Sequence, residues 1–436
     1  MAESFVFDDF TKISDSIQKL LSVTRHSLHG MAESAFCEWE TMDTIALCAK
    51  RCNATLSFLS DEDAKRHLDL IPGIKLHGSQ KFPQAALPGL KATITLRDGP
   101  GVHAAILCDI DALPLKESSD PLRKPVQDGY SSQNGCCHAC AHDGHMAVCL
   151  TLMQTIANHP ELLRDTSINA LSFIFECGEE GCRGASFIRD SSLMDGLNEL
   201  FCFHLGMGLE SGYICPSPDG FLATEKYAFA FRGISAHAGH PELGVNALKP
   251  MAFLMSEALK LPDPDNGTLL NIANVSCPGA LNAIPDKASF LLEIRGRDLQ
   301  SVALMREKLE DLVQKSGAVL FDGDSGEFDS AKIEKEPLCL MRKMGRAIPV
   351  VQDNDLTGLI LRASHSLGLK TKSFSFQASD DASLLIDAMH ARGGKGCYFV
   401  CGADITAPHH NPSFDFDEKA LGNCYFVLLK ALCSHF

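Results

Sequence analysis

Short apolar runs that end in polar, potentially metal-binding residues recur through the first half of the chain. Residues 102–107 precede Cys108-Asp109, residues 168–175 precede Glu179-Glu180, and residues 200–203 precede His204. Runs of this length predict buried strands, and the apolar segment from 143 to 156 predicts a helix between two of them. Alternating strands and helices favour an α/β fold with a mostly parallel central sheet, whose ligands lie at the carboxyl ends of its strands.

Length and a change in the order of elements indicate two domains. A chain of 436 residues exceeds what one core usually supports. After residues 217–220 the pattern becomes strand, helix, strand, strand, helix and a last strand over 332–336, which predicts an inserted ferredoxin-like βαββαβ unit. We therefore expect a discontinuous first domain, residues 1–219 and 337–436, and an inserted second domain, residues 220–336.

Charge and composition argue against several classes of function. The net charge is −16 and we find no cluster of Lys and Arg, which disfavours a nucleic-acid partner. The acidic start lacks the features of a secretory signal, and no apolar run is long enough to span a membrane. The 18 cysteines are scattered and many lie in apolar runs, so we expect free thiols in a reducing cytoplasm.

The segment from Cys137 to His145 joins soft and imidazole ligands at the start of the predicted helix. Cys140 and His142 are two residues apart, so both can face one ion, and Asp143 could cap the helix and hold an imidazole. A redox pair of Cys137 and Cys140, a structural zinc knuckle and inert core cysteines are alternatives. The histidines that follow disfavour the redox pair, and no second ligand pair has knuckle spacing. A core role stays open.

Glu179 and Glu180 form a pair of adjacent carboxylates after a predicted strand. Such a pair is costly to bury unless a cation compensates it, although a solvated loop is the common alternative. One carboxylate can bind an ion while its neighbour takes a proton from water. Together with the cysteine and histidine segment, this pair predicts a hydrolytic metal site.

Further polar residues lie in loops or at strand ends. His204 ends an apolar strand, and His409-His410 precedes the last helix; each is weak evidence alone. In the second domain, His237 is surrounded by small residues, while Asn282 and Arg295 flank a predicted strand. A histidine, an amide and a guanidinium suit an oxyanion and a substrate carboxylate, although a loop, a turn and a surface charge are the plainer explanation.

Six separated motifs resemble, in the same order, the amidohydrolase branch of the aminoacylase and carboxypeptidase metallopeptidases, the group that contains auxin-conjugate hydrolases. They include residues 29–34, 109–113 and 409–418. The resemblance implies two divalent ions per chain, Mn²⁺ or Zn²⁺, in the discontinuous domain. It implies that the inserted domain is a lid through which a homodimer, or a heterodimer with a homologous subunit, forms.

The resemblance also implies hydrolysis of the amide bond of a small-molecule N-acyl or N-aroyl amino acid. The first candidate substrate is p-aminobenzoyl-glutamate, cleaved to p-aminobenzoate and glutamate. Other N-acyl amino acid conjugates, dipeptides, or a non-catalytic metal-binding role are the alternatives.

Roles follow from the same resemblance, position by position. The implied metal ligands are Cys140, His142, Glu180, His204 and His410, and the implied general base is Glu179. Asp109 and Asp143 match acidic residues beside the metals. His237 matches a lid histidine that reaches a neighbouring chain's site, and Asn282 and Arg295 match lid residues that hold substrate oxygens and a carboxylate.

Three positions depart from the pattern of this family. Leu107 stands where an arginine is usual, Ala141 where a glycine is usual, and Cys177-Gly178 where Pro-Ala is usual. Leu107 removes a charge beneath the site, and Cys177 adds a thiol near the metals, from which we expect altered oxidation sensitivity. The implied ligands and base are all present.

Overall fold

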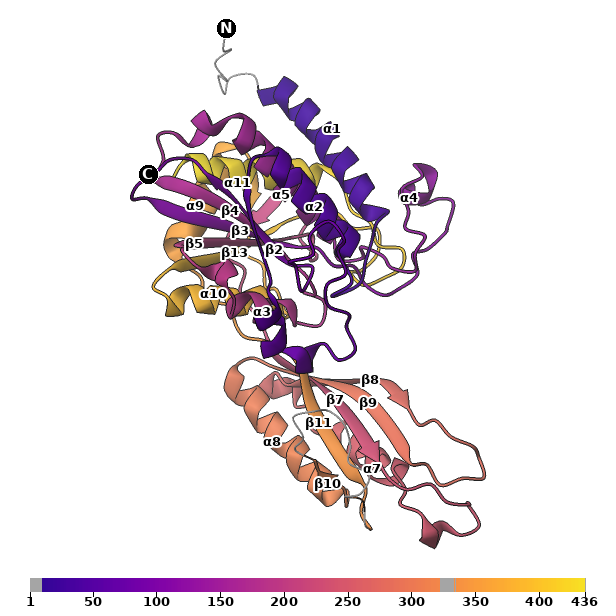
Figure 1. The fold of residues 1–436 in the computed structure, drawn as a ribbon. Coiled ribbons are helices and arrows are strands. Elements are labelled where there is room, and N and C mark those ends of the chain that lie inside the picture. Colours follow the sequence, from indigo (N-terminus) through magenta and orange to yellow (C-terminus); the bar gives the residue numbers. More distant parts are fainter. Residues whose placement is uncertain (1–9, 322–332, 334, 436) are drawn as a thin grey trace.

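The computed structural model describes residues 10–321, 333 and 335–435, in which the strands form two sheets of eight and five strands. Figure 1 shows the eight-stranded sheet, here the large sheet, with its helices in one body. The five-stranded sheet, here the small sheet, projects from it with two helices. Not one of the helices in these residues is long and apolar enough to cross a membrane.

The large sheet has a parallel centre and mixed edges. Its strand order is β1-β2-β4-β3-β5-β13-β6-β12. The four central strands pair in parallel, whereas β1, β2 and β6 are attached by antiparallel pairing. The prediction of a parallel sheet thus holds for its centre. The strands are β1 (Thr55–Phe58), β2 (Leu90–Thr95), β3 (Val102–Asp109), β4 (Ile168–Glu176), β5 (Glu199–Leu205), β6 (Tyr213–Cys215), β12 (Lys370–Thr371) and β13 (Lys395–Cys401).

Two groups of helices cover the large sheet on opposite sides (Figure 1). One group contains α1 (Phe10–His29), α2 (Trp39–Arg51), α5 (His142–Asn158), α9 (Asn354–Ser366) and α11 (Lys419–Cys433). The other contains α3 (Asp61–Arg66), α6 (Gly184–Arg189) and α10 (Ala382–Ala391). A single-turn helix, α4 (Lys124–Gln127), lies outside both groups. Coverage of both faces explains why the central strands are near-continuous apolar runs.

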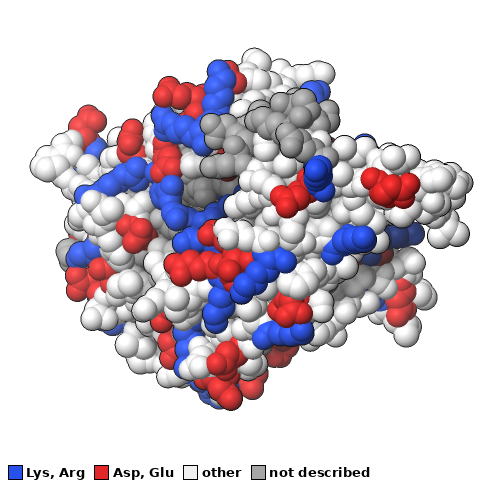
Figure 2. All heavy atoms as spheres, turned by 90° about the horizontal axis from the view of Figure 1, so that it is seen from below, with Lys and Arg blue, Asp and Glu red and all other residues white. Residues whose placement is uncertain are grey.

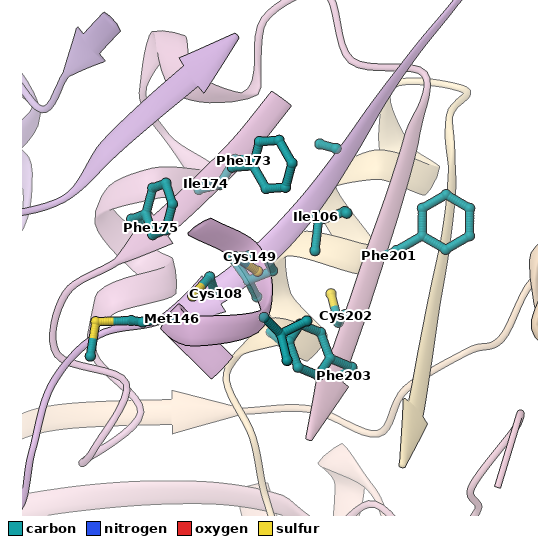
Figure 3. Close-up of a cluster of buried hydrophobic side chains, with 14 of the residues drawn as sticks. Ile106, Cys108, Met146, Cys149, Phe173, Ile174, Phe175, Phe201, Cys202 and Phe203 are labelled. Atoms are coloured by element: carbon teal, nitrogen blue, oxygen red, sulfur yellow. The ribbon is translucent and has the colours of Figure 1, made fainter. Parts of the chain in front are cut away.

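The main core extends over both faces of the large sheet, and one part of it lies between α5 and the central strands. Figure 3 shows aromatic side chains of β4 and β5 beside Ile106 and Cys108 of β3 and Met146 and Cys149 of α5, all of them buried. The polar residues that follow these strands are therefore held in position by a closely packed core.

The small sheet has the strand order β10-β11-β7-β9-β8. Its elements are β7 (Ala223–Arg232), α7 (Leu248–Ala258), β8 (Leu269–Ser276), β9 (Lys287–Gly296), α8 (Leu299–Lys315), β10 (Val319–Leu320) and β11 (Leu338–Ala347). The sequence of β7, α7, β8, β9, α8 and β11 is the βαββαβ order of a ferredoxin-like unit. One face buries Phe229, Phe290 and Ile294 in a second core with the two helices.

The last strand of the small sheet differs from the prediction. Of the residues 332–336 predicted as that strand, 332 and 334 lie outside the described residues, and the other three are not in a strand. β11 begins after Pro337 and pairs with β7 as far as Ala347. Proline has no N–H for the ladder, so pairing starts one residue later. The predicted division between residues 336 and 337 therefore falls before a strand that belongs to the small sheet.

Candidate metal centre

The predicted ligand residues meet at the carboxyl ends of the central strands of the large sheet. His204 lies near the end of β5, and Glu179 and Glu180 follow β4. Cys140 precedes α5 and His142 is its first residue, while His410 lies in the loop between β13 and α11. Crevices at this edge are where α/β sheets bind ligands.

Overlapping groups of possible donor atoms connect these residues. Cys140 Sγ lies 3.5 Å from His204 Nε2, and His410 Nε2 lies 3.4 Å from Glu180 Oε1. Three triads have all their donor atoms within 4.8 Å of one another: Cys140, His142 and His204; Cys140, Glu180 and His410; and His142, Glu179 and Glu180. The five predicted ligands and the predicted base are thus brought together.

The turn that presents Cys140 and His142 requires an unusual backbone conformation. Ala141, the residue between them and the N-cap of α5, has φ +64°. This left-handed region is favourable for glycine and costs other residues about 1 to 2 kcal/mol. The departure from glycine at this position therefore strains the segment that carries two candidate ligands.

Backbone carbonyls fix the orientation of two imidazoles. His142 Nδ1 donates to the Asp111 carbonyl oxygen at 2.9 Å, and His204 Nδ1 donates to that of Leu205 at 2.8 Å. Since a carbonyl can only accept, both Nδ1 atoms carry the proton and both Nε2 lone pairs stay available to an ion. His142 Nε2 and Glu180 Oε1 are buried without a hydrogen-bond partner among the described residues. These orphaned donor atoms fit a divalent cation.

The two predicted supporting acids have different partners. Asp109 Oδ2 contacts His145 Nδ1 at 3.2 Å, beside the cluster. Asp143 is not the N-cap of α5, because Ala141 takes that position. Asp143 does hold an imidazole, that of His29 at 2.8 Å, together with Arg25. It thus connects α1 to the start of α5 and has no contact of this kind with a predicted ligand.

Several neighbours of the cluster were missed by the sequence prediction. Asp111 lies closer to the predicted ligands than Asp109 or Asp143: it holds His142 and accepts the Glu180 N–H at 3.0 Å. His409 Nδ1 lies 3.5 Å from Cys140 Sγ. Asp380 belongs to a further carboxylate triad with Glu179. The spacing of Asp111, two residues beyond Asp109 at a strand end, was a signal that could have identified it.

The electrostatics of the cluster call for positive charge. The pKa of Glu179 is raised well above its usual range, mainly by burial and secondly by the charge of Glu180. Burial also raises the pKa of the Cys140 thiol to about 12. A neighbouring dication reverses both effects, because it favours carboxylate and thiolate over their protonated forms.

Two adjoining cavities open beside the cluster. The smaller, of about 270 Å³, is lined by Cys140, Glu179 and His204, and by Cys182. The larger, of about 420 Å³, lies against the small sheet. Both are lined by Glu180, Gly181, Lys226, Arg295 and His410. Arg295 is therefore near the cluster. Cys177, the thiol expected near the metals, is fully buried and lines neither cavity. The thiols that line the smaller cavity are Cys140 and Cys182.

His237 and Asn282 are not brought to the cluster within one chain. Both are exposed and line neither cavity. They lie near each other, since His237 pairs with Ala283, beyond the end of β7 that points away from the large sheet (Figure 1). His237 Nδ1 accepts the Gly239 N–H at 3.0 Å.

Comparisons with known proteins identify the family. Residues 105–434 match the model of peptidase family M20/M25/M40. A homolog of a p-aminobenzoyl-glutamate hydrolase subunit, from Haemophilus influenzae, is 30% identical over 371 residues, covering 83% of each chain. The corresponding p-aminobenzoyl-glutamate hydrolase subunit of Escherichia coli is 28% identical and covers 95% of each chain. Indole-3-acetyl-aspartic acid hydrolase of Enterobacter agglomerans is 28% identical and covers 91% of each.

Solved structures share the fold over almost the whole chain. An aminobenzoyl-glutamate utilization protein from Klebsiella pneumoniae has a TM-score of 0.72 at 19% identity and covers 98% of each chain. The YXEP protein of Bacillus subtilis, described as a dinuclear metal binding peptidase, has a TM-score of 0.64 at 18% identity, with 96% of this chain and 98% of that chain covered.

The family match and the named relatives show a hydrolase that acts on amide bonds, as expected from the sequence motifs. The chain belongs to peptidase family M20/M25/M40.

Proposed function

We propose that the protein hydrolyses the amide bond of N-acyl or N-aroyl amino acids, with p-aminobenzoyl-glutamate as the first substrate to test. The observation that carries this proposal is the set of overlapping donor triads beside the Glu179 carboxylate. The names of three relatives, two hydrolases of p-aminobenzoyl-glutamate and one of indole-3-acetyl-aspartic acid, support the choice of substrate.

Two divalent ions, Mn²⁺ or Zn²⁺, are the proposed cofactors. Cys140, His142, Glu180, His204 and His410 are their proposed ligands. A thiolate suits zinc, while carboxylate and imidazole ligands also suit manganese. When bound, such ions polarise a carbonyl group and lower the pKa of water to about 7. Asp111 and Asp109 are proposed to hold His142 and its neighbour His145 in position.

Glu179 is the proposed general base. Its carboxylate lines the smaller cavity beside Glu180 and has His142 Nε2 3.9 Å from Oε2. In this role Glu179 accepts a proton from the attacking water and returns it to the nitrogen of the departing amino acid. Arg295 is proposed to bind the carboxylate of that amino acid, since its guanidinium lines both cavities.

His237 and Asn282 are proposed to act across a dimer. Their exposure and their absence from both cavity walls fit residues that complete the site of a second chain. β8 forms one edge of the small sheet, and its residues are largely exposed. The partner is a second copy or a homologous chain, because two of the relatives are named as single subunits of a hydrolase.

The test is an assay of the full-length protein after chelation and reloading with Mn²⁺ or Zn²⁺, alone and with any homologous partner chain. We expect release of p-aminobenzoate that depends on the added ion. A panel of other N-acyl amino acids and dipeptides tests the alternative substrates. Protein that retains two ions and cleaves no member of the panel is a non-catalytic metal-binding protein, and the proposal fails.

A further inference from the structure

The face of the small sheet opposite its helices carries Lys226, Glu293 and Arg295, which line the larger cavity beside the candidate metal centre. Strand register places Lys226 beside Glu293 and Thr224 beside Arg295. Glu293 contacts both cations: Oε2 lies 3.0 Å from Arg295 Nε, and Oε1 lies 3.6 Å from Lys226 Nζ. Because one carboxylate holds both side chains, the two cations are fixed in position without being neutralised.

The larger cavity contains an excess of positive charge. Its wall includes three cations, Arg183, Lys226 and Arg295, and two carboxylates, Glu180 and Glu293. Glu180 is a proposed metal ligand, so a single carboxylate remains for three cations. The chain as a whole has a net charge of −16. On the face shown in Figure 2, Lys and Arg are interspersed with Asp and Glu, so a cationic cavity is a local feature.

Arg183 has no carboxylate partner among the residues that the structure describes. Its Nε is buried and makes no hydrogen bond, and its guanidinium carbon lies 5.0 Å from the centre of the Phe36 ring. A partly buried guanidinium with an unsatisfied donor is suited to bind an anionic ligand. Lys226 and Arg295 line both cavities, so these two cations connect the larger cavity, where Arg183 lies, with the cavity that contains Glu179.

We infer that the released amino acid carries a second carboxylate, which Arg183 and Lys226 bind while Arg295 binds the carboxylate next to the scissile amide. This inference rests on the proposed function and narrows it to conjugates of acidic amino acids. Arg183 and Lys226 act here as specificity residues. A neutral side chain would leave both cations without a partner, and hydrogen bonds to charged groups contribute more than those between neutral groups.

The test compares p-aminobenzoyl-glutamate with p-aminobenzoyl-glutamine, which differs in one side-chain group. We expect the metal-loaded protein to prefer the glutamate conjugate by about tenfold to a hundredfold in kcat/KM. Arg183→Met and Lys226→Met should each lower kcat/KM for this conjugate by about tenfold or more, mainly through KM. The fall in kcat/KM should be smaller for the glutamine conjugate, so the preference for glutamate decreases, and a thermal melting curve shows that each variant is folded.

Controls separate this inference from the proposed function. Arg362→Met alters an exposed arginine on α9 and should leave the preference for the glutamate over the glutamine conjugate unchanged. Arg183→Lys should retain part of the preference because it keeps the charge. In Glu179→Gln protein, L-glutamate should raise the melting temperature more than L-glutamine, a readout that needs no turnover.

If the unaltered protein has the same kcat/KM for the glutamate and glutamine conjugates, the inference is overturned and the proposed function stays intact. Equal loss on both conjugates in the two Met variants also overturns it, since Lys226 or Arg183 would then act at the reacting carbonyl. Absence of turnover with every conjugate overturns the proposed function itself.

Discussion

His410 Nε2 lies 3.4 Å from Glu180 Oε1, although the first residue precedes the last helix and the second follows β4. Each belongs to a loop beyond the carboxyl end of a strand, and β4 and β13 are separated in the sheet by β3 and β5. The contact therefore closes one side of the donor cluster and brings together segments that are distant in sequence. A metal at this position would link them.

The first prediction concerns Cys140. Cys140→Ala should lower the metal content of purified protein below two ions per chain, because the thiol belongs to two of the donor triads. Cys137→Ala is a matched control in the same segment, since Cys137 is buried and belongs to none of them. Plasma emission spectroscopy measures the content. Equal metal loss in both variants, or none in Cys140→Ala, would argue against ligation by this thiol.

The second prediction concerns the base. Glu179→Gln should reduce kcat by about a hundredfold or more while the metal content stays near two ions per chain, because the amide cannot accept the proton. Glu161→Gln, which alters an exposed glutamate far from the cavities, is the control. Retained turnover in Glu179→Gln, measured as p-aminobenzoate release, would remove this residue from the role of base.

The third prediction concerns action across a dimer. His237→Ala and Glu179→Gln should each be nearly inactive alone, yet a reassembled mixture should recover part of the activity. In a mixed dimer, one of the two sites combines an intact Glu179 with an intact His237. The control is reassembly of each variant with itself. No recovery in a mixture shown by size and tagging to contain mixed dimers would indicate that His237 acts within its own chain.

The fourth prediction concerns backbone strain. Ala141→Gly should raise the free energy of unfolding by about 0.5 to 1 kcal/mol, because φ is +64° at this position. Ala147→Gly in the middle of α5 should lower it by about 1 kcal/mol. Urea denaturation of the metal-free protein measures both. A destabilising Ala141→Gly would mean that the strain is absent in solution.

The fifth prediction concerns pH and the contact between α1 and α5. Burial opposes protonation of His29, but hydrogen bonds to Asp143 and Glu117 raise its pKa to about 9. A raised pKa stabilises the fold fully below the unfolded value of about 6.5 and progressively less as the pH rises to about 9. Stability of the unaltered protein should therefore fall over this range. His29→Gln should show a smaller fall, and an unchanged slope would contradict the assignment.

Much of the fold could be predicted because its central strands are buried on both faces. Runs such as residues 168–175 are almost entirely apolar, and the structure extends this strand by one residue to Glu176. β11 was predicted at the wrong residues because charged side chains such as Arg342 and Lys343 interrupt its apolar pattern. Short edge strands such as β12, with two residues, have too little sequence to give a pattern.

The candidate site could be predicted in its residue types and only partly in its contacts. His409 and His410 are adjacent, and no physical feature of the sequence excluded His409 from the cluster; both approach it, His409 through Cys140 and His410 through Glu180. Lys226 was missed because one lysine in an alternating strand resembles a solvated face. Its significance depends on the register that places it beside Glu293.

The two ends of the small sheet have a consequence for how such a molecule can arise. Thr224 at the start of β7 is the register partner of Ala347 at the end of β11, so the chain leaves the large domain and returns to it at one point. A segment whose ends meet can be gained, lost or exchanged during evolution without altering the fold of its host. The proposed ligands on the large sheet and the part of the cavity wall that the small sheet supplies, with Lys226 and Arg295, can therefore diverge at different rates in related genes.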